Sequence, residues 1–113
     1  MYFALASDDR GLTAFPSIVS ALAYCEAIDV EEGGWRFFDI DGTSLRPRVL
    51  APSKRGKMFV ASGKYDLVRD PNGRSLYEEL TNIAYVEGCG LENVDDVVSL
   101  LRKPPSESGE VAE

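Results

Sequence analysis

The chain has 113 residues, of which 44% are apolar and 27% charged, the size and composition of one globular domain. It has no histidine and two cysteines, Cys25 and Cys89, which excludes His-dependent nucleophile systems and His-liganded zinc and argues against a disulfide framework. Its formal net charge of −7 disfavours nucleic acid and membrane surfaces as partners and favours basic ones.

The first segment predicts a strand followed by a helix. Residues 2–7 alternate and are rich in aromatic and aliphatic side chains, which is typical of a strand, and a turn follows at residues 8–11. The apolar period then becomes helical, from the suitable N-cap Ser17 up to Gly33-Gly34. The stripe that carries this helix prediction consists of Ile18, Leu22, Cys25 and Ile28.

Four short strands are predicted next. Residues 35–40 and 45–50 flank Asp41-Gly42, a dipeptide typical of a type I′ hairpin turn, because both central positions of that turn require positive φ. Pro47 indicates an edge strand or a bulge, since proline has no N–H to donate. Residues 58–61 and 65–69 follow as two further strands.

Two helices complete the predicted order. The run Ser75-Leu76-Tyr77-Glu78 is a capping box, and the apolar positions after it continue at helical spacing to Val86. A last helix is expected from Val94 to Leu101, capped by Asn93. Residues 104–113 have almost no apolar content, so we expect a disordered acidic tail there.

The resulting order, β-α-β-β-β-β-α-α, predicts an α+β fold: a mainly antiparallel sheet with its helices packed on one face. We expect a single domain over residues 1–103. The chain has no run long and apolar enough to span a bilayer and no segment that resembles a secretion signal. Together with two separated cysteines, this favours a reduced, cytoplasmic protein.

One motif resembles an enzyme signature. Phe38-Asp39-Ile40-Asp41-Gly42-Thr43 is similar to the nucleophile motif of haloacid-dehalogenase-type phosphohydrolases. That resemblance implies Asp39 as nucleophile, Asp41 as general acid and base, and Mg²⁺ on the phosphate. The parallel sheet of that family requires a helical crossover after the motif, whereas a strand is predicted here within a few residues. We therefore interpret the motif as a hairpin turn and keep the Mg²⁺-dependent phosphohydrolase as an alternative.

The charges are segregated along the chain. Residues 1–45 carry eight acids and two bases, residues 46–74 two acids and eight bases, and residues 75–113 nine acids and two bases, giving net charges of −6, +6 and −7. The basic segment is interpreted as the solvated edge of a sheet, with a phosphate-contacting loop as the alternative. Two acidic clusters are candidate sites for a basic partner, with ordinary helix surface as the alternative; they contain Asp29, Glu31 and Glu32, and Glu92, Asp95 and Asp96.

A second resemblance concerns residues 23–42. This run comprises an E-x-I-D-V-E stretch at the end of a helix, a glycine, an aromatic strand and a D-x-D-G turn. It resembles small bacterial immunity-type proteins that accompany polymorphic or contact-dependent toxins. The resemblance implies an α+β protein that binds and blocks one cognate toxin, with no family site residues to transfer.

We therefore expect a binding protein rather than an enzyme, with no cofactor, no metal and no catalytic residue. A homo-oligomeric accessory protein is a further alternative. In that case Trp35, Phe37 and Tyr65 are expected to form an exposed apolar patch on the sheet.

Overall fold

The computed structural model describes residues 1–56 and 60–101, and it confirms the α+β class. The expected tail at 104–113 and part of the expected strand at 58–61 lie outside the described residues. The elements in chain order are β1 (Tyr2–Ala6), β2 (Gly11–Phe15), α1 (Ile18–Tyr24), α2 (Ala27–Glu31), β3 (Trp35–Asp39), β4 (Ser44–Ala51), β5 (Lys54–Arg55), β6 (Val60–Ala61), β7 (Lys64–Arg69), α3 (Leu76–Glu79), the 3₁₀ helix η1 (Leu80–Asn82), β8 (Tyr85–Glu87) and α4 (Val94–Leu100).

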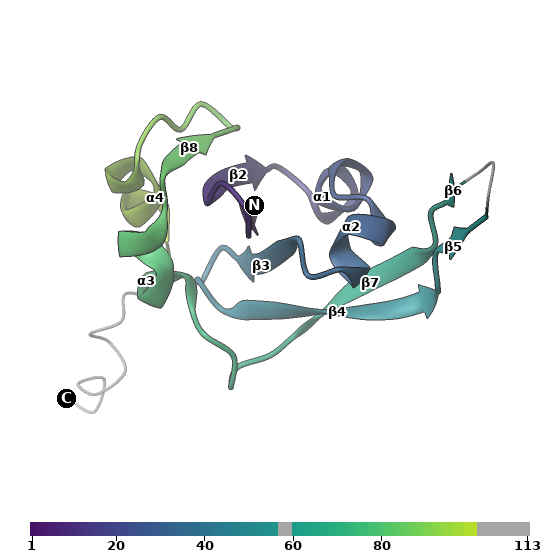
Figure 1. The fold of residues 1–113 in the computed structure, drawn as a ribbon. Coiled ribbons are helices and arrows are strands. Elements are labelled where there is room, and N and C mark those ends of the chain that lie inside the picture. Colours follow the sequence, from purple (N-terminus) through teal and green to yellow (C-terminus); the bar gives the residue numbers. More distant parts are fainter. Residues whose placement is uncertain (57–59, 102–113) are drawn as a thin grey trace.

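Six strands form one sheet in the order β7-β4-β3-β1-β2-β8, so the two edges are β7 and β8 (Figure 1). Every neighbouring pair in it is antiparallel except β2 and β8, which run parallel. β5 and β6 form a separate two-stranded ribbon where β4 and β7 extend away from the helices (Figure 1).

The helices cover both faces of the sheet, so the expected packing on one face is wrong. Phe3 and Leu5 of β1 point to one side, where they pack with residues of α3 and α4. Ala4 points to the other side and joins a core formed with α1 and α2. All three residues are buried, and a strand that is buried on both faces requires a layer on each.

The chain between Phe15 and Trp35 contains a break that the periodicity did not predict. The expected single helix is two helices, α1 and α2, separated at Cys25 and Glu26. The predicted N-cap is confirmed, because the Ser17 hydroxyl accepts the backbone N–H of Ser20 at 3.2 Å. β2, which precedes these helices, was not predicted; it pairs with β1 through a tight turn in which Arg10 has a φ of +61°.

The helix expected after Ser75 is also shorter than its apolar spacing suggested. The capping box is present, since the Glu78 carboxylate accepts the Ser75 N–H at 2.8 Å. The chain then leaves the helical conformation after η1 and forms β8. Pairing with β2 explains the change: the Ala84 N–H donates to the Arg10 carbonyl at 2.8 Å, and Val86 lies opposite Leu12. The helix predicted to follow Asn93 is confirmed as α4, with Asn93 as its N-cap.

Pro47 belongs to β4, which is not an edge strand, but β4 pairs on only one side at this position. The ladder between β3 and β4 comprises the pairs Phe37↔Leu45 and Phe38↔Ser44. Beyond Leu45, β4 pairs with β7, where Pro47 lies opposite Leu67, and the register shifts between Val49 and Ala51. The missing N–H of proline is tolerated on the side where the ladder has ended.

A buried carboxylate ties the layer of α3 to the sheet. Glu79 is 1% exposed, and its Oε2 accepts Arg36 Nη2 from β3 and Arg74 Nε, each at 2.7 Å. Asn82 Nδ2 donates to Oε1 at 3.2 Å. Burial raises the pKa of Glu79, but the hydrogen bond from Asn82 and the two guanidinium groups outweigh it, so the pKa lies below its ordinary value. The carboxylate is therefore ionised in the folded protein near neutral pH.

We predict that Glu79→Ala destabilises the fold by about 2 kcal/mol, because it leaves two arginines without their shared acceptor while both can still reach water. Urea unfolding measures the loss, and Glu92→Ala, at an exposed position, is the matched control. Since the folded pKa of Glu79 is lowered, its contribution is present above the unfolded pKa and lost as the pH falls through the folded one. A difference that does not shrink in acid would contradict the ionic role.

Candidate functional site

The D-x-D-G motif is the turn of the β3–β4 hairpin, which confirms the hairpin interpretation. Asp39 Oδ1 accepts the backbone N–H groups of Asp41 at 2.9 Å and Thr43 at 3.0 Å. Gly42 has a φ of +81°, whereas Asp41 has none of the positive φ that a type I′ turn needs. The turn is instead a three-residue loop closed by a glycine in the left-handed region, and Asp39 stabilises it with its side chain.

The motif is not surrounded by a recognisable metal site. The second Asp39 oxygen lies 3.7 Å from Arg69 Nε, and the Gly42 carbonyl accepts the Leu76 N–H at the start of α3. Within residues 1–56 and 60–101, no group of three or more His, Cys, Asp or Glu side chains is arranged to hold a metal ion. Asp39 therefore stabilises the turn through its hydrogen bonds to the backbone.

The two predicted acidic clusters are not brought together. Asp29, Glu31 and Glu32 belong to the α2 region, which covers one face of the sheet, whereas Glu92, Asp95 and Asp96 surround the start of α4 on the other face. The Glu31 carboxylate accepts both the N–H and the hydroxyl of Ser53, the latter at 2.7 Å, and so ties α2 to the loop after β4. Asp96 accepts the Glu92 N–H at 2.8 Å. Glu31 and Asp96 are thus engaged within the fold.

The exposed patch expected for an oligomer is not present as proposed, because Phe37 and Tyr65 are buried in the core below α1 and α2. The Tyr65 hydroxyl donates to the carbonyl of Cys25 at 2.6 Å and thereby ties β7 to the break between the two helices. Burial, and then the charge of Asp29, raises the pKa of the Cys25 thiol to about 12. This makes Cys25 a structural residue rather than a nucleophile.

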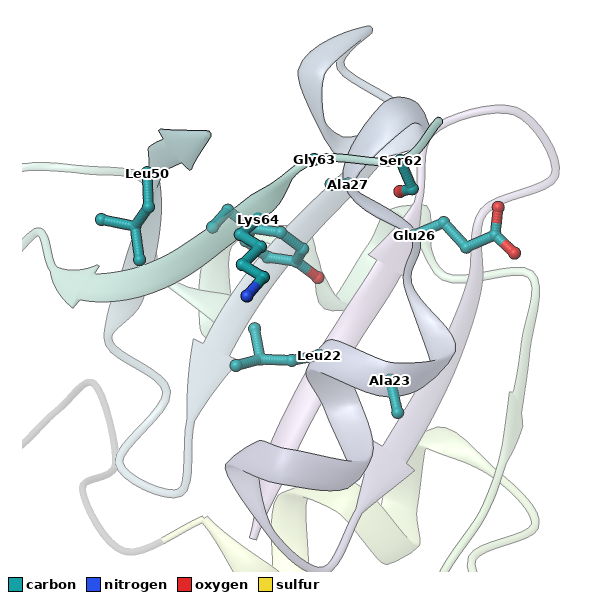
Figure 2. Close-up of a pocket in the computed structure, with 9 residues that line it drawn as sticks. Leu22, Ala23, Glu26, Ala27, Leu50, Ser62, Gly63 and Lys64 are labelled. Atoms are coloured by element: carbon teal, nitrogen blue, oxygen red, sulfur yellow. The ribbon is translucent and has the colours of Figure 1, made fainter. Parts of the chain in front are cut away.

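A groove of about 350 Å³ lies between the α1–α2 corner and the β4–β7 strands. Figure 2 shows the Lys64 side chain extending towards Leu22, while Glu26 points away at the far side. The walls are otherwise small or apolar, and no acid–base pair faces into the groove among the side chains drawn in Figure 2. A second cavity, of about 310 Å³, is lined by Arg10, Arg36 and Glu79, but the Glu79 carboxylate is already satisfied by three donors.

The charge segregation of the sequence becomes a segregation across the sheet. The β7 edge and its neighbour β4 are basic, whereas the opposite edge, around β8, is acidic (Figure 1). We call the following carboxylates the acidic edge: Asp8, Asp9, Glu87, Glu92 and Asp95. None of them forms an ion pair within the described part of the chain, in contrast to Asp66, which pairs with Arg48 at 2.6 Å.

The acidic edge adjoins exposed aromatic side chains that sequence reasoning did not nominate. Tyr24 is 58% exposed and Tyr85 46% exposed. Tyr24, at the end of α1, packs edge-on against Trp35 with ring centroids 6.0 Å apart and against Phe15 at 5.4 Å. We call Tyr24, Trp35 and Tyr85 the aromatic shelf. The sequence did not indicate Tyr85 as a site residue, because its apolar spacing predicted a helix there and the position of its ring depends on the chain forming β8.

Comparison with protein-family models, with characterised proteins and with solved structures finds no match. None of the helices described here is long and apolar enough to cross a membrane. The candidate site therefore depends on the geometry of the acidic edge and the aromatic shelf.

We predict that Asp39→Ala lowers the free energy of unfolding by about 1–2 kcal/mol, because two turn N–H groups lose their acceptor. Asp41→Ala keeps that acceptor and serves as the matched control, with little expected loss. Urea unfolding distinguishes the two variants. Mg²⁺-dependent hydrolysis of p-nitrophenyl phosphate that disappears in both would instead support the phosphohydrolase alternative, in which both carboxylates act.

The two cysteines should differ in reactivity. Cys25 is buried with a raised pKa, whereas Cys89 is exposed between Gly88 and Gly90. We expect one equivalent of thiol to react with a disulfide reagent at pH 8 in the native protein and two equivalents in urea. Cys89→Ser should abolish the native reaction. Rapid native reaction of both thiols would contradict the burial of Cys25.

Proposed function

We propose that this chain is a protein-binding module of the cytoplasm that neutralises one basic toxin, the role implied by its resemblance to immunity-type proteins. The observation that carries the proposal is the acidic edge: a group of carboxylates with no ion pair in the described chain, concentrated on one side of the sheet. A basic protein would supply the positive charges with which these carboxylates do not pair inside the fold.

The position of the basic residues strengthens this reasoning. β4 and β7 carry Arg46, Arg48, Lys64 and Arg69, and these strands lie at the other side of the sheet. A molecule with charges separated in this way presents one side to a basic partner and repels it from the other. Such complementarity raises the rate of association and fixes the orientation of the encounter.

Asp9 is well suited to remain charged at this edge. Its Oδ1 accepts the Gly11 N–H at 2.9 Å, and its Oδ2 accepts the Tyr85 hydroxyl at 2.8 Å. These two hydrogen bonds, the first being the stronger cause, hold the pKa of Asp9 below its ordinary value. The carboxylate is thus ionised and held in one position, which reduces the entropy that a partner would have to remove on binding.

The functional test is neutralisation. The basic protein captured by the tagged chain from its source cells should arrest growth when produced alone, and co-production of this chain should restore growth. Restored growth with a 1:1 complex is the expected result. A captured protein whose toxicity is unchanged by co-production would contradict the proposal.

The electrostatic test uses charge reversal. Asp8→Lys combined with Glu87→Lys should slow association with that protein about tenfold at low salt, because steering charges act mainly on the association rate. The difference should diminish as salt screens the charges. Arg46→Glu, at the other side of the sheet, is the control and should not slow association. Equal effects of both changes would show that the acidic edge has no special role.

A further inference from the structure

The aromatic shelf has a defined geometry. Trp35 of β3 lies opposite Ala6 of β1, and Gly11 of β2 lies opposite Tyr85 of β8. Ala6 and Gly11 directly follow and precede the pair Leu5↔Leu12, so these four residues form one row across the sheet. Two large rings thus stand at the ends of the row and two small residues lie between them.

The row lies on the face of the sheet that α1 covers. Trp35 packs against the core cluster of α1 and α2, and Val86, the neighbour of Tyr85, belongs to the cluster on the opposite face. The Tyr85 ring lies directly over Gly11, where any Cβ would overlap it. Tyr24, at the end of α1, packs edge-on against Trp35 with ring centroids 6.0 Å apart. Tyr24 and Trp35 therefore pack together at the Ala6 end of the row, and the Tyr85 ring covers Gly11 at the other end.

Carboxylates border these rings. The Tyr85 hydroxyl donates a hydrogen bond to the Asp9 carboxylate. Glu87 lies two residues further along β8, opposite Thr13, whose hydroxyl is 3.4 Å from a Glu87 oxygen. Aromatic ring faces attract cations, and adjacent carboxylates add direct charge attraction. A tyrosine and tryptophan cluster with a polar border is also the composition of the energetically dominant part of protein interfaces.

We propose that the aromatic shelf, with Asp9 and Glu87, is the receptacle for an arginine side chain of a basic partner protein. The proposal rests on the proposed function and names the chemistry that the acidic edge recognises. A guanidinium group is favoured over an ammonium because it is planar, stacks on aromatic rings and can pair with a carboxylate through two hydrogen bonds. The negative charges of Asp9 and Glu87 beside the rings favour a basic side chain over an apolar one.

The probe is a fluorescein-labelled tetra-arginine amide, titrated into the full chain at low salt and followed by its anisotropy. Trp35 is the only tryptophan, so its fluorescence reports binding at the shelf independently. We expect both signals to saturate together, with tetra-lysine amide binding about threefold more weakly, the difference that ring stacking contributes at an exposed site. Equal binding of both peptides, or no change in Trp35, would overturn the proposal.

Variants locate the binding site. Tyr24→Ala and Asp9→Asn should each weaken tetra-arginine binding about two- to fivefold, the loss expected when an exposed ring or charge contact is removed. Asp41→Asn, in the β3–β4 turn at the other end of β3 from Trp35, is the charge-matched control, and Val98→Ala, at an exposed position of α4, is the control for apolar truncation. Both controls should bind like the unchanged protein. Thermal unfolding confirms that each variant is folded, and Tyr85→Phe replaces Asp9→Asn if the turn is lost.

The outcomes separate this inference from the proposed function. If Tyr24→Ala leaves toxin neutralisation and peptide binding unchanged while charge reversal of the acidic edge abolishes neutralisation, the shelf is wrong and the function stands. If no basic protein is neutralised, the function falls whatever the peptide does. A second copy, docking its own basic β4–β7 side, is the competing occupant. Concentration-dependent sedimentation that Tyr24→Ala abolishes would assign the shelf to self-association and overturn the proposal.

Discussion

The burial of β1 on both faces is the constraint on which the remaining structure depends. Phe3 and Leu5 fill one core, and Ala4 lies at the floor of the other. Each core requires its own covering layer, and the chain supplies α1 and α2 before the β3–β4 hairpin and α3 and α4 after β7. The small side chain of Ala4 lets the first pair approach closely, while Glu79 fastens the second layer to Arg36 of β3. The position of every surface cluster follows from this three-layer arrangement.

Much of the fold could be predicted from local signals. The wrong predictions concern elements that are decided by contacts between segments distant in the sequence. The caps Ser17, Ser75 and Asn93 and the turn at Asp41-Gly42 were recognised because their chemistry is contained within a few residues. The apolar spacing up to Val86 equally fits a helix, and only the partner strand β2 decides for β8. The alternation expected for residues 2–7 was wrong, because the run Tyr2–Ala6 is continuously apolar, which is itself the sign of a strand buried on both faces.

The sign of the charge at the candidate site could be predicted from the sequence, but the residues that form the site could not. Counting charges along the chain indicated a basic middle between acidic ends; the basic middle supplies β4 and β7 at one edge of the sheet, and the acidic edge borders β8 at the other. Which carboxylates remain available depends on contacts between distant segments. Glu31 is hydrogen-bonded to Ser53 and Glu79 to two arginines. Asp9 comes to lie beside Tyr85, and Glu87 beside Thr13, only because β8 joins β2.

The same parallel pair explains why aromatic rings are found at the acidic edge. Gly11 offers no side chain, so the Tyr85 ring can lie on the backbone of β2 and place its hydroxyl on Asp9. A larger residue at position 11 would displace the ring and release the carboxylate together. Tyr24 is not needed to close a core, since more than half of it is exposed while the neighbouring Phe15 is buried. Rings that the core does not require, held by a hydrogen bond and by edge-on packing, are rigid contact area that costs a partner little entropy to engage. The small loss of side-chain conformational entropy on binding distinguishes the shelf from the acidic helix ends, whose long side chains would have to be fixed by a partner.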